Sequence, residues 1–171
     1  MSIDIDAARR FLFTSARVLE LHRAAHLLDD ASPGPVVDAL RAYRNDDGGF
    51  GHALEPDVRD PHSQISATMS ALEILAEVGA PDSELVTGAV TWLETVANDD
   101  GGLVQVLPTA ADYPAAPWMR PSPGSSFLTY PTVAHLQRLT VRSAWLDRAA
   151  DWCWQSLETD GPAHAYKVCF G

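Results

Sequence analysis

The stretch Asn45-Asp46-Asp47-Gly48-Gly49-Phe50-Gly51 decides how this chain of 171 residues is interpreted, because its first five residues recur identically. The second copy, Asn98-Asp99-Asp100-Gly101-Gly102, begins 53 residues later, and each copy follows a pattern of apolar residues typical of a helix. A third, degenerate copy is indicated 60 residues further on, where Trp152 corresponds to Trp92 and Asp160-Gly161 to Asp100-Gly101. An identical string in the same helical context indicates an internal repeat. Its turns are placed near three ranges: 45–51, 98–102 and 158–161.

The segments between these turns have helical periodicity, and none shows the sustained alternation of a strand. The first segment carries two apolar stripes, which predict a helix buried on more than one side. Six helices, paired as three hairpins, are predicted: 7–28, 36–44, 64–78, one capped by Asp82 and running to about 97, one with Pro131 in its first turn and running to about 141, and 143–157. The fold class is therefore predicted to be all-α, built from helical-hairpin repeats.

Charge and composition exclude several classes of protein. With 12 Lys and Arg against 23 Asp and Glu, the net charge of −11 disfavours nucleic-acid binding and attachment to anionic membranes. Cys153 and Cys169 are too few for a disulfide framework. The N-terminus has no targeting signal, and no apolar run has the roughly 18 residues of a membrane span. A single cytoplasmic domain over residues 1–171 is expected.

The repeated turns allow two interpretations. Their paired carboxylates could bind a hard cation, Mg²⁺ or Ca²⁺. Apart from Mg²⁺ at these turns, no cofactor and no metal site is expected. Alternatively, the glycines supply positive φ while Asn and Asp bond to the neighbouring backbone. Repetition favours the structural interpretation, because a binding site is rarely duplicated at every turn.

The turn and the helix after it, which opens with Ser66-Ala67-Thr68-Met69-Ser70-Ala71-Leu72, resemble the repeat of the terpenoid cyclase and protein prenyltransferase superfamily. In the second repeat, Thr132 and Leu136 compare with Thr68 and Leu72. The resemblance implies an α/α toroid and an isoprenoid or other apolar substrate. Two motifs of the superfamily are missing: the acid expected before Thr68 is absent, and Asp151-x-Cys153, which superficially matches a zinc motif, falls in an outer helix with Cys153 on its apolar stripe.

The resemblance also implies about six hairpins in a closed ring, and this chain supplies three. We therefore expect either the N-terminal half of a longer chain or a half-ring completed by a second copy, because an unfinished repeat array exposes its apolar edge.

The segment from Gly51 to His62 is the densest candidate site, with three acids, two histidines and an arginine. Its counterpart in the second repeat, Val104–Ala110, is uncharged, and unequal copies are typical of a site added to one repeat. Carboxylic acids near apolar walls have raised pKa values and donate protons. The catalytic candidates are Glu55, Asp57, Asp60 and His62, and the candidates for substrate contact in this segment are His52 and Arg59. The alternative interpretation is a solvated loop.

Aromatic residues provide the remaining candidates for substrate contact, because their faces stabilise cations. They are Phe50, Tyr130 and, on the proline-rich segment 103–126, Tyr113 and Trp118. A segment of this length without helical pattern is often a lid or binding loop.

Three hypotheses for the function, each from a different class of protein, follow from the sequence. The first is a cyclase- or prenyltransferase-like enzyme with a small apolar substrate. The second is a non-catalytic binding or interaction module, favoured by the missing superfamily motifs. The third is a carbohydrate-processing toroid, in which two carboxylates would face each other across a Trp-lined groove.

Overall fold

The computed structural model describes residues 4–159, and these form seven α-helices and two short 3₁₀ helices. None of the described residues belongs to a β-strand; two isolated bridges, Arg44–Phe50 and Val58–Ala115, are the nearest approach to one. The described part of the chain is all-α, as predicted. The chain divides into two compact units, with the boundary between Ala42 and Tyr43. No helix among the described residues is both long enough and apolar enough to cross a membrane.

The first unit contains α1 (Ile5–Ser15), α2 (Val18–Asp29) and α3 (Gly34–Leu40). The prediction of one helix over 7–28 is wrong, because the backbone becomes extended at Ala16 and Arg17. Just before this break, the Thr14 hydroxyl donates to the carbonyl of Arg10 at 3.0 Å. Side-chain bonds of this kind compete with the helical backbone and favour helix ends.

The predicted burial of this segment on several sides is also wrong for α1. No residue of α1 is buried, and its large apolar side chains Phe11 and Phe13 are exposed. On α2, Leu19 is buried as its stripe predicts. Two stripes on a helix therefore do not by themselves specify what covers them.

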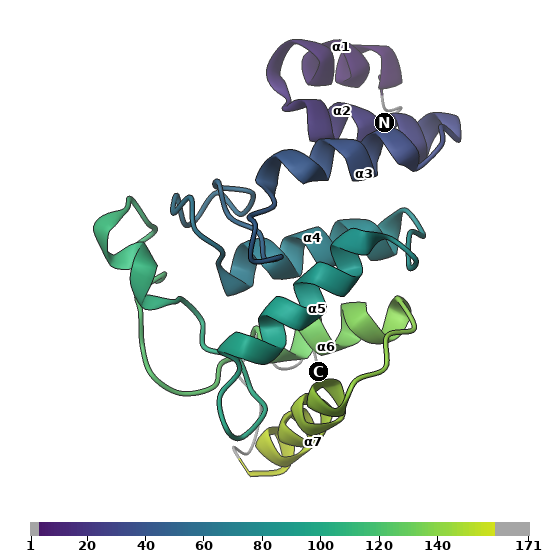
Figure 1. The fold of residues 1–171 in the computed structure, drawn as a ribbon. Coiled ribbons are helices and arrows are strands. Elements are labelled where there is room, and N and C mark those ends of the chain that lie inside the picture. The colour runs from purple at the N-terminus through teal and green to yellow at the C-terminus, as the bar shows by residue number, and fades with distance from the viewer. Residues whose placement is uncertain (1–3, 160–171) are drawn as a thin grey trace. The chain divides into compact units, whose positions relative to one another are not determined.

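The second unit contains α4 (Ile65–Glu77), α5 (Glu84–Val96), α6 (Thr129–Arg138) and α7 (Ala144–Thr159). Helix α4 contacts α6, while α5 contacts α4 and α7 contacts α6 (Figure 1). The predicted cap of α5 is displaced by one residue: the Ser83 hydroxyl, rather than Asp82, accepts from the Leu85 amide at 3.2 Å.

The two complete copies of the repeated turn have the same hydrogen bonds. The Asn45 amide donates to the Gly49 carbonyl, and the Asn98 amide donates to the Gly102 carbonyl, both at 2.9 Å. Asp47 Oδ1 accepts from the Gly49 amide at 2.9 Å and from the hydroxyl of Ser63 at 2.7 Å. Asp100 Oδ1 has the same two bonds, at the same lengths, with Gly102 and Ser125. The second aspartate of each turn therefore holds the turn together, which supports the structural interpretation.

Trp92 and Trp152, which the sequence comparison treats as equivalent, occupy corresponding places, because each packs against the second glycine of one turn. A Cβ on Gly49 would lie 2.6 Å from the ring of Trp92, and one on Gly102 would lie 3.1 Å from the ring of Trp152. The third turn, at Asp160-Gly161, lies outside the described residues.

The threonine correspondence needs correction. Thr68 Oγ1 accepts from the Phe50 amide at 3.0 Å, and the same bond in the second repeat is made by Thr129, which accepts from the Leu103 amide at 2.9 Å. Thr132 instead donates to the Leu128 carbonyl in its own helix. The bonding partner in the second repeat thus lies one helical turn before the residue that the sequence comparison selects.

Candidate functional site

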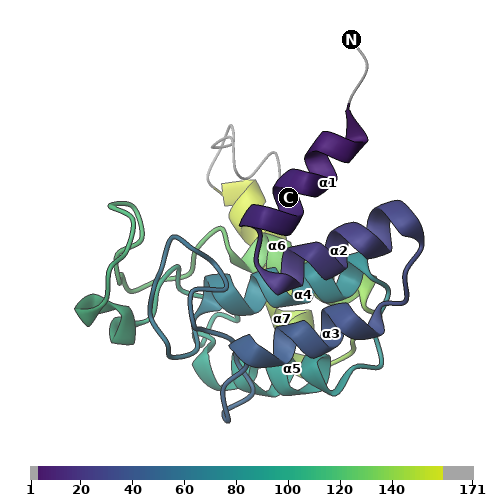
Figure 2. The ribbon, with the colours of Figure 1, turned by 90° about the horizontal axis from the view of Figure 1, so that it is seen from above.

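The loops that precede α4 and α6 lie side by side in the second unit, as both ribbon views show (Figures 1 and 2). The Arg59 amide donates to the Pro114 carbonyl at 2.9 Å, and the Ala116 amide donates to the Asp57 carbonyl at 2.8 Å. A small apolar cluster joins the loops beneath these bonds: Val58, Val106, Ala110 and Met119. The proline-rich segment is therefore anchored to the acidic segment by backbone bonds and apolar packing, and it includes the 3₁₀ helix η2 (Pro108–Asp112).

Asp60 and Gln64 form a buried polar network at the base of the loops. Asp60 is 1% exposed; its Oδ1 accepts from the His62 amide at 2.9 Å, and its Oδ2 accepts from Gln64 Nε2 at 2.8 Å. Gln64 Nε2 also donates to Thr109 Oγ1 at 2.8 Å, while its Oε1 accepts from the Leu107 amide at 2.9 Å. This network ties the acidic segment to the proline-rich segment across 45 residues of sequence.

The pKa of Asp60 is lowered, which is opposite to the direction expected for a proton donor. Burial alone would raise this pKa, but hydrogen bonds from the His62 amide, the Thr109 hydroxyl, the His62 ring and the Gln64 amide together outweigh it. The Asp60 carboxylate is thus held ionised as a hydrogen-bond acceptor, and its environment suits a structural role.

A hollow of about 260 Å³ opens between the first turn of α4, the start of α6 and the two docked loops. This volume is slightly below the usual range for drug-sized ligands, so the hollow suits a small molecule. Most of its wall is apolar. The lining residues are Glu55, Asp57, Ser66, Met69, Gln105, Trp118, Met119, Phe127 and Leu128.

The two acids of the hollow are held by neighbouring donors. Glu55 Oε1 accepts from the Asp57 amide at 3.3 Å, and Glu55 Oε2 accepts from the Ser70 hydroxyl at 3.4 Å. Asp57 Oδ2 accepts from the Trp118 indole Nε1 at 2.9 Å. This last bond fixes the exposed indole, which comes from the proline-rich loop, at the edge of the hollow.

Ser66 is the polar group in the hollow that lacks a partner. It is 3% exposed, it lies in the first turn of α4, and its Oγ has no hydrogen bond within the described part of the chain. A buried hydroxyl without a partner costs about 1–3 kcal/mol, so its presence at a hollow points to a ligand group or water as the missing partner.

The structure separates the sequence-predicted residues into different surroundings. Glu55, Asp57 and Trp118 line the hollow, whereas Asp60 and His62 belong to the polar network. Tyr113 lies edge-on to the His62 ring, with the ring centroids 5.8 Å apart.

The other predicted residues do not line this hollow. Phe50 is fully buried, and Arg59 is exposed. His52 is exposed, and its Nε2 lies 3.0 Å from Oδ1 of Asn45.

Sequence reasoning missed Ser66 and Gln64. One signal was available for both: each is a polar residue at the start of the mainly apolar stretch that becomes α4. A polar residue at such a place needs a partner, and for Gln64 the structure supplies three.

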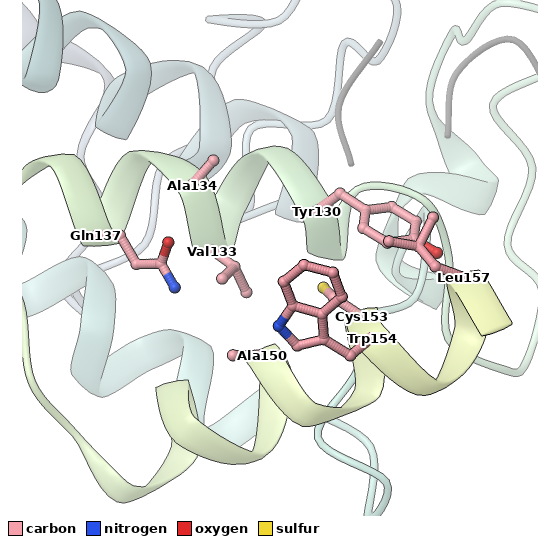
Figure 3. A pocket seen from close by; sticks show the side chains of 8 residues that line it. All are labelled: Tyr130, Val133, Ala134, Gln137, Ala150, Cys153, Trp154 and Leu157. Carbon is pink, nitrogen blue, oxygen red and sulfur yellow. The ribbon is translucent and has the colours of Figure 1, made fainter. Parts of the chain in front are cut away.

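Tyr130 lines a second, smaller hollow of about 110 Å³ between α6 and α7. Figure 3 shows Tyr130 and Val133 from α6 on one side and Cys153 and Trp154 from α7 on the other. Cys153 is buried, as its place on the apolar stripe predicts, and burial raises the pKa of its thiol to about 12. The thiol is therefore protonated at neutral pH and is a poor nucleophile.

The hydroxyl of Tyr130 is buried and has no partner among the described residues. Replacing Tyr130 with Phe should leave the free energy of unfolding unchanged or raise it by up to about 1 kcal/mol, because no bond is lost. Chemical denaturation measures this. Its matched control is Thr129→Val, which removes a buried hydroxyl that accepts from Leu103 and donates to Ser126. This control should cost about 1–3 kcal/mol, and an equal cost for Tyr130→Phe would show that the hydroxyl is bonded.

Within residues 4–159, no three His, Cys, Asp or Glu side chains are grouped so as to hold a metal ion. Comparison of the chain with protein families, with curated proteins and with solved structures gives no match.

Proposed function

We propose that this protein binds a small, mainly apolar molecule in the hollow between α4, α6 and the two docked loops. The observation that carries the proposal is the unpartnered Ser66 hydroxyl inside an apolar-walled hollow of about 260 Å³. Binding sites for small molecules typically combine apolar walls with a few convergent polar groups. Glu55 and Asp57 supply two more polar groups at the same hollow.

The internal repeat supports a wider proposal about architecture. The duplicated turns and the packing of Gly49 on Trp92 and Gly102 on Trp152 support a helical-hairpin repeat. We propose that the hairpins belong to an α/α toroid like that of the terpenoid cyclase and prenyltransferase superfamily.

The same geometry bears on the choice among functions. Glu55 and Asp57 lie two residues apart on one loop, whereas a carbohydrate-processing site would place its carboxylates across a groove. Acid/base catalysis by Glu55 and Asp57 on an apolar substrate is the second candidate, favoured by their position at an apolar wall. Binding is the simpler activity, and catalysis would require it.

The test is a titration of the isotopically labelled full chain with 1-hexanol, followed by amide NMR shifts. This probe has an apolar body for the walls and a hydroxyl that can bond to Ser66. The shifts should be concentrated in residues 55–70 and 105–128. Shifts distributed evenly over the chain, or absent, would overturn the proposal.

Two tryptophan variants make the test specific, because Trp118 and Trp154 are equally exposed, at 66% and 67%. Trp118→Ala removes part of the wall and should weaken 1-hexanol binding about five- to tenfold, as expected for the loss of one apolar contact surface. Trp154→Ala, which affects the other hollow, should leave the affinity unchanged. An equal effect of both variants would contradict binding at this hollow.

A further inference from the structure

The two carboxylates of the hollow have no cationic partner in the described chain. Neither Glu55 nor Asp57 forms an ion pair with any described Arg or His side chain; their partners are the Asp57 amide, the Ser70 hydroxyl and the Trp118 indole. All three are neutral donors. Two negative charges therefore lie at the wall of one apolar hollow without a compensating charge from residues 4–159.

The walls strengthen the effect of these charges on a ligand. Apolar side chains lower the local dielectric constant, so a charge placed beside Glu55 and Asp57 interacts with them more strongly than it would in water. The aromatic side chains of Trp118 and Phe127 also line the hollow, and the face of an aromatic ring attracts cations. An anionic head group, such as a phosphate, would meet repulsion instead, and the net charge of −11 adds to that repulsion at longer range.

The Ser66 hydroxyl supplies an independent indication of a ligand. The Ser66 hydroxyl is buried and has no partner among the described residues, and it lines the hollow together with mainly apolar side chains. A ligand that fills the hollow therefore has an apolar body with its charged group near the loop carboxylates.

We propose that this hollow selects a molecule with an apolar body and a protonated amine. The ammonium group lies against Glu55 and Asp57 beside the Trp118 ring, and the apolar body packs on Met69, Met119 and Phe127. This inference rests on the proposed function, since it names the ligand class of the same hollow.

The experiment compares hexylammonium with 1-hexanol by the same NMR titration. The two probes share an apolar chain and differ in charge. At low salt, hexylammonium should bind about tenfold more tightly, and the preference should shrink as salt is added, because screening weakens the attraction. Hexanoate, with the opposite charge, should bind more weakly than 1-hexanol.

A charge-matched pair of variants tests the residues. The double variant Glu55→Gln/Asp57→Asn should lose the preference for hexylammonium while retaining 1-hexanol binding. The control, Asp46→Asn/Asp99→Asn, removes two exposed carboxylates of the repeated turns, outside the hollow, and should retain the preference. Should the double variant fail to fold, the salt dependence and the hexanoate comparison on the wild-type chain decide the question.

The outcomes separate this inference from the proposed function. If none of the three probes shifts the residues of the hollow, the proposed function fails. If 1-hexanol and hexylammonium bind equally, or hexanoate binds best, the hollow binds apolar molecules but the inference about charge is overturned. If the control variant also loses the preference for hexylammonium, the preference comes from the net charge of the protein, and the role of Glu55 and Asp57 is overturned.

Discussion

Replacing Gly48 or Gly101 with Ala is expected to lower the free energy of unfolding by about 3 kcal/mol or more, from two additive causes. Both residues have positive φ, +94° and +90°, which costs a residue with a Cβ about 1–2 kcal/mol. In addition, the new Cβ would lie 2.6 Å from the Gly88 carbonyl oxygen in the first repeat and 2.8 Å from the Arg148 backbone in the second. These helical backbone atoms cannot move aside as a side chain can, so overpacking adds about 1–3 kcal/mol.

Gly79→Ala is the control that separates the two causes. Gly79 also has a positive φ, +66°, but nothing lies within 4 Å of the position of its Cβ. This variant should therefore cost only the backbone term, about 1–2 kcal/mol. Denaturant titration of the three variants measures the difference, and a cost for Gly48→Ala no larger than that for Gly79→Ala would show that the turn does not pack closely on α5.

The turns could be predicted from the sequence because their chemistry is local. Gly48 needs its positive φ, and Asp47 bonds to a residue two positions away. Both requirements are satisfied within a few residues, so the repeated string specifies them. The packing of Trp92 on the first turn, and of Trp152 on the second, was not predicted, because each tryptophan lies more than 40 residues beyond the glycine that it contacts.

The roles of the acidic residues could not be predicted, because they depend on distant residues. Asp57 and Asp60 are three positions apart, yet Asp57 bonds to Trp118 at a hollow and Asp60 is enclosed by His62, Gln64 and Thr109. Asp60 has local donors in His62 and Gln64, but the docking of the proline-rich loop is what brings Trp118 to Asp57 and Thr109 to Asp60. The same docking separates Trp118, which lines the hollow, from Tyr113, which contacts His62.

Tyr130 illustrates a second reason for the incomplete site prediction. It precedes Pro131 in the first turn of α6, close in sequence to Phe127 and Leu128, which line the larger hollow. Phe127 and Leu128 precede α6, whereas Tyr130 lies in its first turn and contacts Trp152 of α7, with the ring centroids 5.7 Å apart. Aromatic composition alone therefore cannot assign a residue to a hollow.

Asp60→Asn should lower the free energy of unfolding by about 2–3 kcal/mol at pH 7, the usual value of hydrogen bonds to a charged group. Both carboxylate oxygens accept bonds, Oδ1 from His62 and Oδ2 from Gln64. The amide nitrogen of Asn would therefore replace one acceptor and face a donor, whichever way the side chain turns. The matched control is Asp57→Asn, because Asp57 is only partly buried and should cost no more than about 1 kcal/mol.

The dependence of this cost on pH follows from the lowered pKa of Asp60. A depressed pKa in the folded state means that the unfolded chain binds the proton at higher pH, so the ionised carboxylate stabilises the fold above the ordinary Asp pKa of 3.8. That stabilisation is lost as the pH falls through the folded-state pKa. The difference between wild type and Asp60→Asn, measured by denaturation at pH 7 and pH 3, should therefore narrow at pH 3. If the difference were the same at both pH values, the charge of the carboxylate would not stabilise the docked loops. If a stably folded Asp60→Asn chain lost ligand binding, Asp60 would have to be counted among the binding residues.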